Sequence, residues 1–106
     1  MLYVIFSTFP DEESAEKVAK EAIAKRLAAC IWIVPGIKSY YIWKNEMQED
    51  KEVLLVAKVP EEKVDELTEF VRKNHPYEVP EIIGVKADRV LPEYLKWAKE
   101  VCQGEG

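Results

Sequence analysis

The stretch that decides the fold is Ala29–Val59, which reads ACIWIVPGIKSYYIWKNEMQEDKEVLLVAKV. β-branched and aromatic residues dominate its two arms, 30–43 and 47–59, as half-buried strands require. Pro35-Gly36 interrupts the first arm, and Lys44-Asn45-Glu46 separates the two. Because Asn tolerates the left-handed conformation of tight turns, the stretch predicts one long β-hairpin.

The hairpin should be longer than the domain that carries it. Each arm of roughly 14 residues spans about 45 Å at ~3.3 Å per residue. A compact domain of this length has a radius of gyration of about 13 Å. Two strands alone are marginally stable in water, and the outer part carries the apolar run Tyr40–Trp43. We therefore expect the hairpin to pack on other copies of the chain.

Strand and helix patterns precede the hairpin. Leu2–Phe6 is apolar throughout and predicts a central strand buried on both faces. Asp11 is the expected N-cap of a helix that runs to about Leu27. The buried stripe of this helix should comprise Ala15, Val18, Ala19, Ala22, Ile23 and Leu27. Three Glu-to-Lys pairs spaced i,i+4 should stabilise its exposed side: Glu13 with Lys17, Glu16 with Lys20, and Glu21 with Lys25.

A second helix should open at Pro60-Glu61-Glu62 and end near Asn74, because Pro76 disfavours helix at the residue before it. A last strand follows at Glu81–Ala87, and a third helix begins at Pro92.

The order β-α-β-β-α-β plus a C-terminal helix predicts an α+β, ferredoxin-like split βαβ fold in one domain, 1–106, with residues 104–106 frayed. Right-handed crossovers place the first and third strands at the centre of a four-stranded antiparallel sheet, with both long helices on one face. The third helix or a neighbouring subunit must cover the other face.

Composition limits the classes of partner. The 106 residues carry a formal net charge of -5 without a basic cluster, so we expect no nucleic-acid partner. No signal peptide or long apolar run is visible, so we expect no membrane association. Two cysteines outside any Cys-x-x-Cys pair favour a reducing, cytoplasmic location. Charged residues make up 33% and Asn plus Gln number four, a thermostable composition with an expected melting temperature above ~90 °C.

His75, the one histidine, is the first candidate metal ligand, with Glu81 six residues on across a proline-rich loop. Together they could bind copper or another divalent cation. Alternatively, His75 caps the second helix or hydrogen-bonds the loop. Cys30 could be a soft copper ligand or a buried, inert thiol.

Polar and aromatic residues of the hairpin form the second candidate site. Glu52 and Lys58 lie six residues apart and so face the same side of the sheet. They could line an inter-subunit cleft, or they could form an interfacial ion pair. The expected cleft residues are Ser39, Tyr41, Trp43, Glu52, Lys58 and Tyr77. No nucleophile–base pair and no glycine-rich phosphate loop is visible, so we do not expect an enzyme.

Several segments resemble the divalent-cation tolerance protein CutA family over nearly the whole chain. They are Ser7-Thr8-x-Pro10, Leu27-Ala28-Ala29-Cys30, Pro35-Gly36, Ser39-x-Tyr41-x-Trp43, Glu52, Lys58, His75-Pro76-Tyr77-Glu78-x-Pro80-Glu81-Ile82 and Tyr94-Leu95-x-Trp97.

This resemblance implies a ferredoxin-like homotrimer with a non-enzymatic role in tolerance to divalent metals, copper especially. Ser7 and Asn74 stand where copper-binding relatives carry Cys and His, so only His75 and Glu81 remain from that ligand set. We therefore expect weak copper binding. The alternative is a trimeric small-molecule sensor or signalling module with its ligand in inter-subunit clefts.

Overall fold

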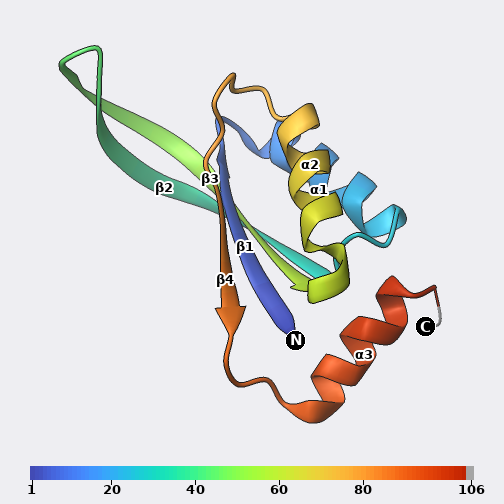
Figure 1. The fold of residues 1–106 in the computed structure, drawn as a ribbon. Coiled ribbons are helices and arrows are strands. Elements are labelled where there is room, and N and C mark those ends of the chain that lie inside the picture. Colours follow the sequence, from blue (N-terminus) through green and yellow to red (C-terminus); the bar gives the residue numbers. More distant parts are fainter. Residues whose placement is uncertain (105–106) are drawn as a thin grey trace.

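The computed structural model describes residues 1–104 (Figure 1). Its element order is that expected from the sequence. In chain order the elements are β1 (Leu2–Phe9), α1 (Glu12–Ala24), β2 (Cys30–Trp43), β3 (Glu46–Pro60), α2 (Val64–Asn74), β4 (Ile82–Ala87) and α3 (Pro92–Cys102). No helix within the described residues is long and apolar enough to cross a membrane.

The four strands form one antiparallel sheet in the order β2-β3-β1-β4, so the expected central position of the first and third strands is confirmed. Helices α1 and α2 lie side by side on one face, and α3 lies near the N-terminus at one end of the sheet (Figure 1).

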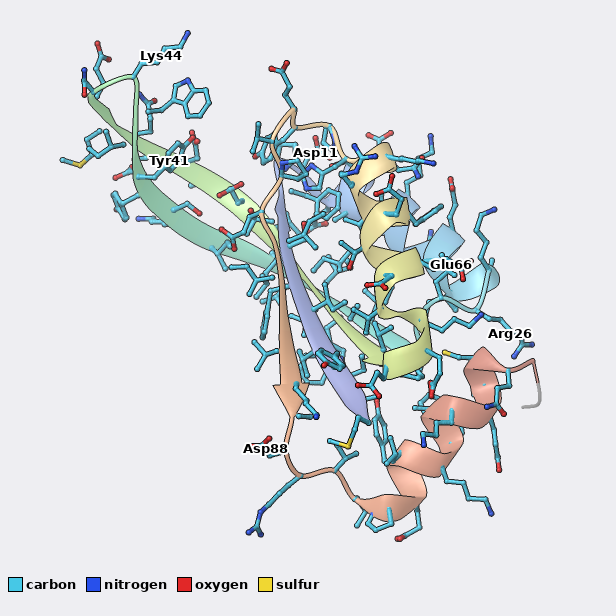
Figure 2. The ribbon with its side chains drawn as sticks, viewed as in Figure 1. Asp11, Arg26, Tyr41, Lys44, Glu66 and Asp88 are labelled. Carbon is cyan, nitrogen blue, oxygen red and sulfur yellow. The ribbon has the colours of Figure 1, made fainter. Side chains whose placement is uncertain are left out.

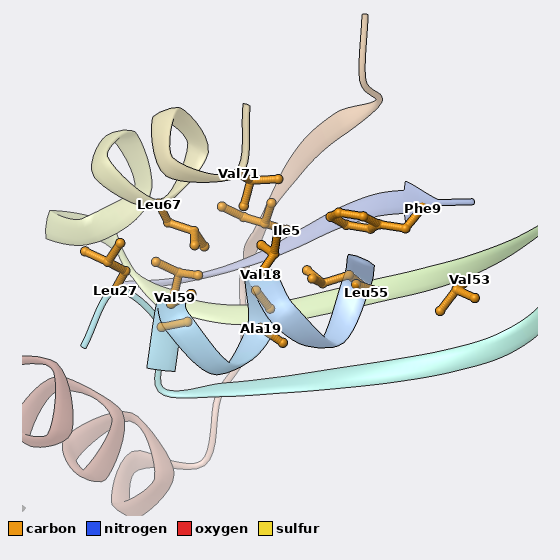
Figure 3. Close-up of a cluster of buried hydrophobic side chains, with 14 residues drawn as sticks. Ile5, Phe9, Val18, Ala19, Leu27, Val53, Leu55, Val59, Leu67 and Val71 are labelled. Atoms are coloured by element: carbon orange, nitrogen blue, oxygen red, sulfur yellow. The ribbon is translucent and has the colours of Figure 1, made fainter. Parts of the chain in front are cut away.

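The core fills the space between the sheet and the two long helices (Figure 3). Alternate residues of β1 and β3 point into it, while α1 contributes mainly alanines, which allow close packing. Its buried members include Ile5, Phe9, Val18, Ala22, Leu27, Val53, Leu55, Val59, Leu67 and Val71.

Two predictions for the N-terminal half are wrong. β1 extends to Phe9, and Val4 and Phe6 are only half-buried, because α1 and α2 lie on the other face of the sheet and α3 covers only the end around Leu2. α1 ends at Ala24, since the backbone reverses at Arg26, which has φ +59°. Leu27 is still buried, but from the loop after the helix.

The three expected ion pairs on α1 are also absent: none of them has its charged atoms within 4.0 Å. Within the described residues, ion pairs join Lys63 to Glu66 at 4.0 Å and Arg72 to Glu69, both exposed and spaced i,i+3. Exposed pairs gain little Coulomb energy in water and lose side-chain entropy when they form. Any high thermal stability must therefore come from another source.

Pro60 ends β3 instead of opening the second helix, and a 3-10 turn at Glu61–Lys63 precedes α2. The end of α2 at Asn74 and the start of α3 at Pro92 agree with the sequence prediction. Gly104 belongs to the turn after α3, and the rest of the expected frayed segment, residues 105–106, lies outside the described residues.

The hairpin projects far beyond the helical layer (Figure 1). The chain measures 47 × 26 × 22 Å, with a radius of gyration of 14.5 Å, so the predicted overshoot is confirmed. β2 continues through Pro35-Gly36, where the register with β3 shifts as a β-bulge and Gly36 has φ +81°.

The hairpin turn has two residues rather than the three expected, since Trp43 pairs with Glu46. Lys44 and Asn45 have φ +52° and +65°, the left-handed pair that suits the twist of hairpin strands. Asn adopts this conformation readily, whereas lysine is held there at an energetic cost.

Replacing Lys44 by Asn should therefore stabilise the protein by about 0.5–1 kcal/mol per protomer, because it removes part of that cost. Chemical denaturation at fixed protein concentration measures the change. Lys51→Asn, at an exposed strand position of the same hairpin without positive φ, is the control and should not stabilise. A loss of stability in Lys44→Asn would contradict the conformational argument.

Candidate functional site

A half-open cavity of about 440 Å³ lies between the outer part of the β2–β3 hairpin, beyond the bulge, and the loop before β4. Among the described residues, four carboxylates and three aromatic rings line it, and no lysine or arginine does. The lining residues are Thr8, Tyr41, Trp43, Asp50, Glu52, Tyr77, Glu78, Val79 and Glu81.

Five of the residues predicted for a site therefore meet at this cavity: Tyr41, Trp43, Glu52, Tyr77 and Glu81. Figure 2 shows Tyr41 on the hairpin, beyond the layer of α1 and α2. The other three predicted residues, Ser39, Lys58 and His75, are not part of its wall.

Two hydrogen bonds between a tyrosine and a carboxylate lie in the cavity wall. The Tyr77 hydroxyl donates to Glu52 Oε2 at 2.8 Å, and the Tyr41 hydroxyl donates to Asp50. Burial, reinforced by the bond to Glu52, raises the pKa of Tyr77, and the bond to Asp50 raises the pKa of Tyr41. Both hydroxyls therefore stay protonated at neutral pH and remain donors to the carboxylates.

His75 lies behind the cavity wall with both ring nitrogens hydrogen-bonded to the backbone. Nε2 donates to the Thr8 carbonyl at 2.8 Å, and Nδ1 accepts from the Tyr77 N–H at 3.1 Å. The ring also stacks on Phe9, with centroids 4.1 Å apart. His75 is only 9% exposed, and burial lowers its pKa, so the ring is the neutral tautomer protonated on Nε2. The structure shows the loop-bonding arrangement that the sequence left open as an alternative to metal binding.

The arrangement offers few ligands to a metal. Among residues 1–104, no three His, Cys, Asp or Glu side chains are placed to hold one ion together. Ser7 is fully buried, and its hydroxyl has no hydrogen-bond partner in the described part of the chain. The Asn74 amide donates to the Phe70 carbonyl at 2.9 Å. A metal on His75 would have to replace one of the two backbone hydrogen bonds.

Lys58 lies elsewhere on the same sheet face. Its Nζ sits 3.3 Å from the centroid of the Trp32 ring, and its strand neighbour is Cys30. Burial lowers the pKa of Lys58. Cys30 is half-exposed rather than buried as one reading of the sequence expected, and Cys102 is buried against Leu2 in a second small core under α3.

The sequence prediction missed four wall residues: Thr8, Asp50, Glu78 and Val79. Asp50 pairs with Ser39 across the hairpin. Counting outward from a two-residue turn at Lys44-Asn45 would have placed Asp50 two pairs from Tyr41, on the same face. Nothing in the sequence pattern indicated Thr8, which enters the wall only because β1 runs three residues further than expected.

Known proteins are similar to this chain over nearly its full length. A family model described as CutA1 divalent ion tolerance protein matches residues 3–101. "Protein CutA" of Mus musculus is 44% identical over 98 residues, which are 92% of this chain. The chain spans only about half of that relative, 55% of its length.

A bacterial relative and a solved structure match end to end. The "Divalent-cation tolerance protein CutA" of Thermotoga maritima is 43% identical over 99 residues, covering 93% of this chain and 97% of that protein. The structure of the divalent cation tolerance protein (Cut A1) from Thermus thermophilus superposes with a TM-score of 0.91 at 42% identity, covering all of both chains.

Proposed function

Because the chain belongs to the CutA1 divalent ion tolerance protein family, we propose that it is a non-enzymatic homotrimer that takes part in the response to divalent metal ions, copper included. The observation that carries this proposal is the cavity, whose wall in the described part of the chain holds four carboxylates and no cationic side chain. Carboxylate oxygens attract divalent cations, and the uncompensated negative charge favours any cation over an anion.

Binding of metal in this cavity should be weak. Two of the four carboxylates already accept hydrogen bonds from tyrosines, and the imidazole of His75 is bonded at both nitrogens. We place Glu81 and His75 as the metal ligands, with the His75 loop opening to release one nitrogen. Breaking that buried hydrogen bond costs free energy, which makes the free energy of metal binding less favourable by the same amount.

Trimer formation is supported by apolar surface that the protomer leaves uncovered. α3 covers only one end of the open sheet face, around Leu2 and Ala29. On the outer hairpin, Tyr40, Ile42 and Met47 are 59%, 66% and 74% exposed. Contiguous apolar surface of this kind is typical of protein–protein contacts.

A second candidate function is a small-molecule sensor. The observation that favours it is the aromatic part of the wall, Tyr41, Trp43 and Tyr77, since ligand pockets are commonly lined by aromatic rings with a few polar groups. Metabolite-dependent shifts in melting temperature that metals do not produce would favour this candidate over the first.

We also propose a cytoplasmic location. Its support is that Cys30 and Cys102 are free thiols, one of them half-exposed, as in a reducing compartment.

Calorimetric titration of the tag-free protein with divalent copper tests the metal role. We expect a dissociation constant in the micromolar range or weaker, where ~1 μM corresponds to about -8.2 kcal/mol. Glu81→Gln should weaken binding at least tenfold, because it removes one carboxylate ligand without disturbing the core. The matched control is Glu13→Gln, an exposed position on α1 remote from the cavity wall, which should leave binding unchanged. Nanomolar affinity, or binding unaffected by Glu81→Gln, would overturn this placement.

A further inference from the structure

A buried lysine and a half-exposed cysteine lie side by side at the end of the sheet that α3 covers. Lys58 of β3 is directly opposite Cys30 of β2 in the antiparallel register, so the two side chains point to the same face. Residues opposite each other in such a pair have their Cβ atoms about 4.5–5.5 Å apart. α3 contributes Tyr94 to this end of the sheet, where its hydroxyl lies beside the Cys30 thiol.

Lys58 is a buried cation that lacks a counter-charge. It is 7% exposed, and within the described residues its Nζ has no hydrogen-bond partner and belongs to no ion pair. The Trp32 ring, 3.3 Å away at its centroid, compensates only part of the hydration that burial removes. Burial lowers the pKa of Lys58, and the adjacent Cys30 thiol opposes that lowering. Cys30 is therefore the neighbour that can balance the lysine charge.

A thiol beside an ammonium group is in the surroundings that activate cysteine. The thiolate is the nucleophilic form, and only a few per cent of a free thiol is ionised at pH 7. A neighbouring lysine ammonium stabilises the thiolate. At this site the thiolate would in turn give the buried Lys58 the counter-charge that it lacks, so each ionised group favours the other.

The second cysteine of the chain is in different surroundings. Cys102 is 4% exposed and lies in the small core under α3. Burial raises the pKa of its thiol, which therefore stays protonated at neutral pH. Cys30 is half-exposed and begins β2, the strand at the edge of the sheet, so a small reagent can reach it from solvent. The two thiols should differ in reactivity within one molecule.

We propose that Cys30 is a modification site at which hydrogen peroxide oxidises the thiol to a sulfenic acid, with Lys58 as the group that stabilises the thiolate and supplies the proton for the departing oxygen. Neither residue lines the cavity between the hairpin and the loop before β4, so this reactivity is separate from the proposed metal role. All the groups involved belong to one chain.

The reaction is a two-electron oxidation of sulfur. The Cys30 thiolate attacks one oxygen of hydrogen peroxide, so the S–O bond forms while the O–O bond breaks. The departing hydroxide takes a proton from the Lys58 ammonium and leaves as water. Lys58 is left as the neutral amine and regains a proton from solvent. Because a second thiol reduces a sulfenic acid by way of a disulfide, the modification is reversible.

Oxidation of the intact, reduced protein by hydrogen peroxide at pH 7 tests the site. Dimedone traps the sulfenic acid, and peptide mass spectrometry measures the rate at each cysteine. Full ionisation of a free thiol of pKa ~8.5 raises its thiolate fraction about 30-fold, and the lower basicity of a stabilised thiolate offsets part of that gain. We therefore expect Cys30 to react about tenfold faster than glutathione under the same conditions, and Cys102 to stay unlabelled.

Lys58→Met should slow the oxidation of Cys30 about tenfold and leave Cys102 unlabelled. If Lys58 had only a structural role, its loss would loosen the packing and speed oxidation at both cysteines, which is the opposite sign. Lys51→Met, at an exposed position of the same strand, is the matched control and should leave the rate at Cys30 unchanged.

Two results would overturn the proposal. One is a wild-type Cys30 that reacts no faster than glutathione, which decides the question even if Lys58→Met fails to fold. The other is a rate at Cys30 that Lys58→Met leaves unchanged or raises. Titration of Cys30→Ser with divalent copper keeps the two proposals apart, because its affinity should equal that of the wild type whether or not Cys30 is reactive.

Discussion

Replacing His75 by alanine should lower the free energy of unfolding by about 3 kcal/mol per protomer. The change leaves the Thr8 carbonyl and the Tyr77 N–H without their side-chain partner, at about 1–3 kcal/mol for each group left unsatisfied in the interior. It also removes the ring that stacks on Phe9 and opens a cavity there. Chemical denaturation of the variant and the wild type at equal concentration measures the loss.

The neighbouring residue gives the control for this prediction. Asn74 is exposed, and its side chain makes one local hydrogen bond, to Phe70, so Asn74→Ala should cost less than about 1 kcal/mol. If His75→Ala proves as mild as Asn74→Ala, His75 does not hold the loop as described.

Because the pKa of His75 is lowered in the folded protein, its contribution to the free energy of unfolding depends on pH. Burial is the main cause of the lowering, and the hydrogen bond to the Thr8 carbonyl opposes it only in part. Between the unfolded value of ~6.5 and the lower folded value, the unfolded chain binds more protons than the folded one. The contribution of His75 to stability is therefore complete above pH ~6.5 and falls as the pH drops through the folded pKa. The stability difference between wild type and His75→Gln should shrink in this acidic window, as denaturation at a series of pH values would show.

Replacing Ile42 and Met47 together by aspartate should convert the proposed homotrimer into monomers. The two residues face each other across the outer hairpin and are 66% and 74% exposed in the protomer. Burying a large apolar side chain contributes about 1.5–3 kcal/mol, and a charge in its place must be desolvated at each of the contacts. Light scattering should report three times 12.3 kDa for the wild type and 12.3 kDa for the variant.

The same variant should lose most of its heat resistance. We expect the wild type to melt above ~90 °C and the variant more than about 20 °C lower. The described residues form only two ion pairs, both exposed, and the proposed assembly would add the stability that the protomer lacks. Leu91→Asp, which charges an apolar position that is 64% exposed next to α3, is the control and should leave both mass and melting unchanged. A variant that remains trimeric would show that the outer hairpin is not the main contact.

The sequence was most informative where its pattern repeats. Strand periodicity and the β-α-β-β-α-β order were enough to predict the sheet order, both long helices on one face and the length of the hairpin. The sequence was less informative where the backbone conformation of a single residue decides where an element ends. The reversal at Arg26 shortens α1, and nothing in the apolar stripe up to Leu27 indicates it, because Leu27 is buried in either case.

The candidate site was also predicted only in part, because strand periodicity indicates the face on which a residue lies but not its neighbours from distant segments. The even spacing of Glu52 and Lys58 along the strand correctly placed both side chains on one face of the sheet. That spacing does not show which of the two lies next to the loop that forms the cavity. The hydrogen bonds that engage His75 depend on the Thr8 carbonyl, 67 residues away in sequence. Such contacts between distant segments have no signature in local pattern, so the sequence alone could not choose between a ligand and a structural histidine.

The bulge at Pro35-Gly36 has a consequence for aggregation. β2 forms an edge of the sheet, and an exposed edge strand of this length can recruit further strands without limit, as in fibrils. Proline offers no N–H to an added strand, and the bulge bends the edge away from the flat geometry that strand addition needs. The 14-residue edge strand β2 is therefore interrupted near its midpoint. The interruption hinders the addition of further strands along the whole edge and so disfavours fibril growth.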